Sequence, residues 1–136
     1  MACPWAAPHA SSETSPAAVD RAHEELSELL ANLDRELAEI ETLLASAHFH
    51  AVVSVAELTR ELLSGHEGHP ELKTRRARLE VMIATAQVAL GQRAVAQRSM
   101  MRALYADPAL SLDEGTTSPK VLELLREARR HGRTAP

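Results

Sequence analysis

Histidines are the residues of this chain whose types and spacing come closest to a chemical site. His66, Glu67 and His69 offer three groups that can bind a transition metal. They lie in a glycine-containing segment, however, and lack the i, i+4 helical spacing by which zinc proteases place two imidazoles on one ion. His48 and His50 are two residues apart and therefore point to different sides of a helix. We expect no metal site.

Other chemistries find less support in the sequence. No stretch resembles a nucleotide-binding glycine loop or a nucleophile motif. A basic run within residues 73–78 could contact phosphate groups, although a solvated helix face is the simpler interpretation. The chain has only three aromatic residues, so it offers no platform for stacking bases. We expect no enzymatic activity, no cofactor and no nucleic acid partner, which leaves another protein or peptide as the expected partner.

Charge is distributed unevenly along the 136 residues. The chain up to Glu71 holds 13 acidic and 3 basic residues, whereas the chain from Leu72 on holds 6 acidic and 12 basic residues, which together give the net charge of −4. This polarity can steer a charged partner, or it can let acidic early helices lie beside basic later ones. Leu, Val, Ile, Met and Ala supply nearly all apolar content, which favours an all-α fold with one modest core.

The first helix is predicted to begin at Ser15-Pro16. Residues 1–15 are rich in Ala, Pro and Ser, and we expect them to be a disordered tether. Serine accepts a backbone N–H at a helix start, and proline fits the first helical position. Residues 16–64 then read as a long helix or as a helical hairpin. The apolar spacing shifts phase near Phe49, which favours a turn at 47–50, but no glycine or proline marks it, so a single continuous helix is the alternative.

An apolar stripe with alternating four- and three-residue spacing runs along this first helix. Its members are Leu26, Leu30, Leu33, Leu37, Ile40, Leu44 and Ala47. Acidic residues fill much of the opposite face. We favour packing of the stripe against the chain's own helices, and the alternative is a coiled coil through which the chain associates with itself.

Glycine and proline divide the rest of the chain. Residues 64–70 end the preceding helix because they contain two glycines and a proline. A hairpin is predicted over 71–108, with helices at 71–90 and 94–106 separated by Gly91. Ser118-Pro119 repeats the serine and proline start, so a C-terminal capping helix is predicted over 118–131, closed by Gly132. About five helices are therefore expected.

Within the hairpin, small and apolar residues fall at a recognisable set of positions: Ala84, Gly91, Ala96, Met100, Ala103 and Pro108. This spacing over about residues 77–108 resembles a tetratricopeptide repeat. Alanines on both helices would allow two backbones to cross closely. A degenerate second copy is suggested 44 residues upstream, by matching Val52 to Ala96. The resemblance implies a short solenoid of helical hairpins that serves as a non-enzymatic adaptor or scaffold.

Departures from the repeat pattern are visible at Glu80, Gln87 and Arg93, where the family usually has aromatic residues. Tetratricopeptide hairpins bind peptides along their first helices, so the resemblance implies a partner-binding face on the helix of residues 71–90. That face would consist of Arg78, Val81, Met82, Thr85 and Val88. Alternatively, its apolar members are buried against the preceding hairpin.

Met1-Ala2-Cys3 followed by a Pro/Ala/Ser segment resembles what remains of a bacterial lipoprotein after its signal peptide is lost. The segment after Pro108 also resembles the ending of some Gram-negative envelope proteins with such repeats. These resemblances imply a lipid on Cys3 and a place in the bacterial envelope or periplasm, with membrane contact only through that lipid. The alternative is an ordinary polar front segment with one incidental thiol, in a soluble cytoplasmic protein.

Overall fold

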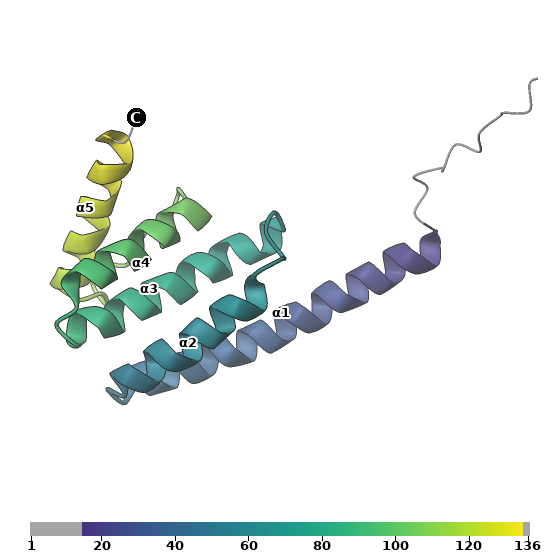
Figure 1. Cartoon of the computed structure of the whole chain (residues 1–136), viewed down its shortest axis with the longest axis horizontal. Helices are drawn as coiled ribbons and strands as arrows, with labels where there is room; N and C mark the ends of the chain where they lie inside the picture. Colours follow the sequence, from purple (N-terminus) through teal and green to yellow (C-terminus); the bar gives the residue numbers. More distant parts are fainter. Residues whose placement is uncertain (1–14, 135–136) are drawn as a thin grey trace, which may run out of the picture. The chain divides into compact units, whose positions relative to one another are not determined.

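The computed structural model describes residues 15–134 and is all-helical, which confirms the predicted fold class. Five α-helices and a short 3-10 turn (η1) are present in these residues, and no strand (Figure 1). The elements, in chain order, are α1 Pro16–Ala45, α2 Phe49–Leu63, η1 Pro70–Leu72, α3 Lys73–Ala89, α4 Arg93–Ala106 and α5 Pro119–Thr134. The expected disordered tether lies outside the described residues, except for Ser15.

The chain divides into two units after Ala31. The first unit holds the N-terminal half of α1, and the second holds the remaining half of α1 with all later helices. In the second unit, α3 packs against both α2 and α4, and α5 packs against α4 and α3. Acidic side chains of α1 meet basic side chains of α3 here: Arg75 donates to Asp34 at 2.8 Å, and Arg78 pairs with Glu41. Some of the acidic residues of the early chain and some of the basic residues of the later chain therefore pair with each other inside the fold.

Serine caps begin the first and last helices as predicted. The backbone N–H of Ala18 donates to the hydroxyl of Ser15 at 3.2 Å. The N–H of Val121 lies 3.4 Å from the hydroxyl of Ser118. Each serine therefore partners a backbone N–H that the first helical turn leaves unpaired.

The two turns between paired helices share one hydrogen-bonding pattern. At the first turn, the N–H of Ala47 donates to Leu44 O at 3.1 Å and that of His48 to Leu43 O at 2.9 Å. Gly91 and Gln92 repeat these bonds 44 residues later, to Val88 O and Gln87 O. Both are Schellman endings, which need a left-handed residue: φ is 60° at Ala47 and 74° at Gly91. The structure thus has a turn at 46–48, and a single continuous helix from 16 to 64 is wrong.

The last helix runs further than predicted. Gly132 was expected to close it, but α5 continues to Thr134. Glycine in a helix interior costs only about 1 kcal/mol relative to alanine, so without a following proline it does not force an end. At the start of the second hairpin, Pro70 opens η1 and α3 begins at Lys73, two residues after the predicted position.

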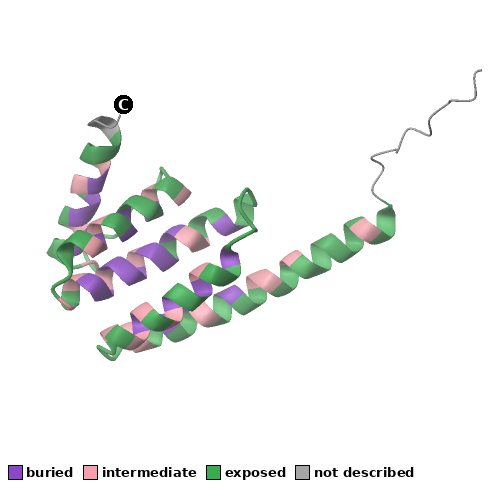
Figure 2. Ribbon diagram, viewed as in Figure 1, coloured by how far each residue is buried: buried purple, intermediate pink, exposed green. Residues whose placement is uncertain are grey.

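One core cluster joins α3, α4 and α5. It contains Ala84, Ala96, Met100, Ala103, Val121, Leu124, Leu125 and Ala128. Ala84 and Ala96 are both completely buried in it, as close packing of two helices requires. Val52 and Ala56 of α2, which lie 44 residues before Ala96 and Met100, are equally buried. α2 and α4 therefore follow turns of the same geometry and bury residues at two corresponding positions. Figure 2 shows buried segments on α2, α3, α4 and α5.

Candidate functional site

The face predicted on α3 is mostly committed to the chain's own packing. Met82 is buried with 5% exposure. Val81 and Val88 are half-buried and pack against the cluster of α3, α4 and α5. Thr85 is half-buried, and its hydroxyl donates to Val81 O at 2.7 Å. Arg78 is exposed but paired with Glu41 of α1. These five residues therefore do not form a continuous free surface.

A groove lies elsewhere in the second unit, where α2, the 64–70 segment, α3 and α4 meet. It encloses about 650 Å³, and Leu63, Leu79 and Ala106 supply apolar lining. Four basic side chains line it, namely Arg60, Lys73, Arg76 and Arg102, against the two acidic side chains Glu67 and Glu80. We call this hollow the basic groove.

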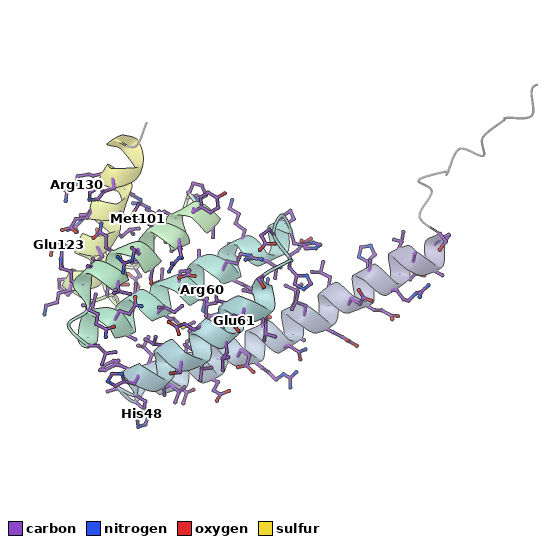
Figure 3. The ribbon with its side chains drawn as sticks, viewed as in Figure 1. His48, Arg60, Glu61, Met101, Glu123 and Arg130 are labelled. Carbon is purple, nitrogen blue, oxygen red and sulfur yellow. The ribbon has the colours of Figure 1, made fainter. Side chains whose placement is uncertain are left out.

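Internal partners hold two of the four cations. Arg60 lies between α2 and α3 (Figure 3) and donates twice to the Glu80 carboxylate, each time at 2.7 Å. This hydrogen bond raises the pKa of Arg60, against the opposing effect of burial. Arg76 donates to Leu63 O at 2.6 Å, which satisfies a carbonyl near the end of α2. Both guanidinium groups are therefore fixed in position.

The other two cations are freer. Lys73 lies 3.7 Å from the Asp107 carboxylate, a loose pair with a lysine side chain 49% exposed. Arg102 is exposed on α4, and within residues 15–134 no side chain forms an ion pair with it. The Glu67 carboxylate supplies negative charge beside these cations. N–H groups of the loop, including that of Gly65 at 3.1 Å, donate hydrogen bonds to this carboxylate and lower its pKa. Positive charge exceeds negative charge in the groove.

Tyr105 forms one edge of the groove and is 91% exposed. It also borders a second, mostly apolar hollow of about 510 Å³ between α4 and α5. Met101, one helical turn before Tyr105, lines that second hollow and is itself 42% exposed (Figure 3). Tyrosine combines a large apolar ring with a polar end, a combination enriched at protein interfaces. α4 thus presents an exposed ridge with a hollow on each side.

Two buried polar pairs involve Glu80 and Gln87 of α3. Glu80 is buried with 6% exposure and takes the two hydrogen bonds of Arg60. Gln87 is buried, and its amide oxygen accepts the hydroxyl of Ser99 at 2.8 Å. Each pair joins different helices, α2 with α3 and α3 with α4. The bonds satisfy groups whose burial would otherwise be costly.

The histidine segment gives no sign of a metal centre. The rings of His66 and His69 are 6.3 Å apart between centroids, and both residues are exposed. In the part of the chain that the structure describes, no three His, Cys, Asp or Glu side chains are grouped to hold an ion. Nor does any helix within residues 15–134 have the length and apolar character to cross a bilayer. Cys3 lies outside the described residues, so its lipid attachment stays a prediction.

Sequence reasoning missed the basic groove because its lining comes from residues 60 to 106, on four elements. Each cation by itself reads as part of a solvated helix face. One signal for the groove was present in the sequence. Ala96, Met100 and Ala103 mark the buried side of α4, and Tyr105, one of three aromatic residues in the chain, lies one turn after Met101 on the other side of that helix. This position predicts that Tyr105 is exposed.

Comparisons with known proteins add no relative: no protein-family model, no curated protein and no solved structure matches this chain.

Proposed function

We propose that this protein is a non-enzymatic adaptor of the tetratricopeptide type, which holds an acidic segment of another protein in the basic groove. The observation that carries the proposal is the exposed Tyr105 beside a groove in which basic side chains outnumber acidic ones. A carboxylate-bearing segment suits Arg102 and Lys73, which are only weakly engaged within the fold. An apolar side chain of the partner suits Pro70, Ala106 and the ring of Tyr105, which line the same groove and are not buried.

Preorganisation supports the same proposal. Arg60 and Arg76 are held by hydrogen bonds to Glu80 and to Leu63 O, so little conformational entropy is lost when a partner binds beside them. Tyr105 brings large contact area with only two rotatable side-chain bonds. The fold therefore offers a rigid receptor surface on α2, α3 and α4. Attachment to a bacterial envelope membrane through Cys3 is an additional part of the proposal and rests on the sequence resemblance alone.

A peptide array tests the proposal directly. Peptides of matched length and varied charge are probed with the full chain, and we expect acidic peptides that carry an aliphatic or aromatic residue to bind best. Tyr105→Ala and Arg102→Glu should each weaken binding at least tenfold, because Tyr105 supplies contact area and Arg102 supplies charge. Added salt should weaken binding further.

Two control variants locate the site. Arg126→Glu reverses an exposed charge on α5 outside both hollows and should leave binding unchanged. Arg78→Glu tests the face predicted on α3. Loss of binding on Arg78→Glu together with normal binding by the Tyr105 and Arg102 variants would move the site to α3. Peptide binding that ignores charge would contradict the proposal.

A further inference from the structure

Tyr105 separates two hollows on the surface of the second unit. The basic groove lies on one side of it, and the hollow of about 510 Å³ between α4 and α5 lies on the other. We call the latter the apolar hollow, since six of the seven described residues that line it are uncharged. The described residues that line both hollows all belong to the second unit, so that unit sets their shape.

The helical spacing of α4 explains why Tyr105 stands between the hollows. At about 100° per residue, Arg102 and Ala106 of the basic groove lie about 60° and 100° to one side of Tyr105. Met101 and Leu104 of the apolar hollow lie about 40° and 100° to the other side. The shortest path from one hollow to the other therefore crosses the ring of Tyr105.

The ridge between the hollows gathers exposed apolar side chains. Five large hydrophobic residues are exposed within residues 15–134, and two of them, Met101 and Tyr105, lie one turn apart on this ridge. Single exposed apolar residues are common, but neighbouring ones are typical of interaction surfaces. Arg129 is the one charged residue among the described lining of the apolar hollow, and its guanidinium donates to Leu110 O. The apolar hollow therefore suits an apolar side chain.

We infer that one segment of the partner occupies both hollows, with an acidic residue in the basic groove, an apolar residue in the apolar hollow, and the chain between them crossing Tyr105. This inference rests on the proposed function, because the basic groove holds the acidic residue. A single segment is favoured over two separate ligands because Tyr105 lines both hollows. Once the acidic residue is bound, the apolar residue docks without the cost of a second association.

The width of α4 sets the spacing between the two partner residues. A helix with its side chains is about 10 to 12 Å across, so a path over its surface from Arg102 past Tyr105 to Met101 or Leu104 is about 10 to 15 Å long. An extended chain advances about 3.3 Å per residue. The acidic and the apolar residue of the partner should therefore stand about three to five positions apart.

Fluorescence anisotropy with labelled synthetic peptides and the full chain tests the inference. A short peptide carries two glutamates with one apolar residue beside them, in a Gly/Ser background. Extended peptides add one leucine, either directly beside the glutamates or about four positions away, and are made in both chain directions. In one of the two directions, the distant leucine should tighten binding about tenfold or more relative to the short peptide, because burial of a leucine side chain is worth about that factor.

Two variants alter the apolar hollow and leave the lining of the basic groove intact. Met101→Gln replaces an exposed apolar side chain by a polar one of similar length. Gly132→Phe adds a ring where the described part of the chain leaves open space around an added Cβ. Both should remove most of the gain from the distant leucine without weakening the short peptide. The matched control, Leu58→Gln, changes an exposed residue of α2 outside both hollows and should have no effect.

The outcomes separate this inference from the proposed function. If neither the short nor the extended peptides bind, both are contradicted. A short peptide that binds while the distant leucine adds no more than the adjacent one overturns the inference and leaves the proposed function standing. A gain that survives both Met101→Gln and Gly132→Phe, or that Leu58→Gln removes equally, also overturns it. So does a dimer in analytical ultracentrifugation under reducing conditions that Met101→Gln disrupts, since a second copy then fills the apolar hollow.

Discussion

Replacing Arg60 by methionine should destabilise the fold more than replacing its partner Glu80. The Glu80 side chain has 8% exposure and its carboxylate receives both hydrogen bonds of the Arg60 guanidinium. Arg60→Met leaves that carboxylate buried without a partner, whereas after Glu80→Met the arginine, 32% exposed, can turn toward water. The order of the two effects follows from this difference in solvent access.

The magnitudes follow from the same geometry. Removing one partner of a fully buried ion pair lowers the free energy of unfolding by about 3 to 5 kcal/mol. Because Arg60 is partly exposed, we expect a smaller loss of about 2 to 3 kcal/mol for Arg60→Met. Glu80→Met should cost no more than about 1 kcal/mol, since it removes the buried charge and places an apolar side chain there. The double variant should lie within about 1 kcal/mol of the wild-type chain.

Urea unfolding followed by far-ultraviolet circular dichroism measures all four members of this double-mutant cycle. Helix content reports directly on an all-helical fold, and no tryptophan is present in residues 15–134 to serve as a probe. Equal costs for Arg60→Met and Glu80→Met would refute the reasoning from unequal exposure. A double variant as unstable as Arg60→Met alone would show that lost packing, and not the unpaired carboxylate, causes the destabilisation.

Three further predictions concern turns, close packing and pH. Gly91→Ala should lower the free energy of unfolding by about 1 kcal/mol, and Ala47→Gly should raise it by up to about 1 kcal/mol, because the backbone is left-handed at both positions. Thermal unfolding measures the sign of each change. Destabilisation by Ala47→Gly would contradict the shared turn geometry. Ala96→Leu should lower the free energy of unfolding by about 1 to 3 kcal/mol, since residue 96 is completely buried. No change in urea unfolding would mean that the interface between α3 and α4 can accommodate a larger side chain. The Arg75 hydrogen bond lowers the pKa of Asp34, so this pair stabilises the fold above the ordinary aspartate pKa and ceases to do so as pH falls through the lowered value. Because that carboxylate is 52% exposed, Asp34→Asn should cost less than about 1 kcal/mol at neutral pH. The difference from wild type should shrink steadily as pH falls below the ordinary aspartate pKa of about 3.9, and a difference that does not change with pH in that range would exclude the ion pair as its cause.

Residues close in sequence determined where most helices begin and end. Ser15-Pro16 and Ser118-Pro119 predicted the starts of α1 and α5, and Gly91 predicted the turn between α3 and α4. These signals are readable because a cap or a left-handed glycine acts within a few residues of its own position. The all-α class followed from composition and from apolar spacing in the same way.

The phase shift of the apolar spacing favoured a turn near Ala47, but only the structure excluded a continuous helix there, because alanine adopts the conformation that glycine adopts at residue 91. It also decided that Glu80 pairs with Arg60, 20 residues earlier in the chain, and that Val81 and Val88 pack against the cluster of α3, α4 and α5. Such contacts depend on which helices become neighbours, and the packing of buried side chains over the whole second unit sets that arrangement. The basic groove has the same origin, since its lining residues come together only when α2, α3 and α4 are assembled.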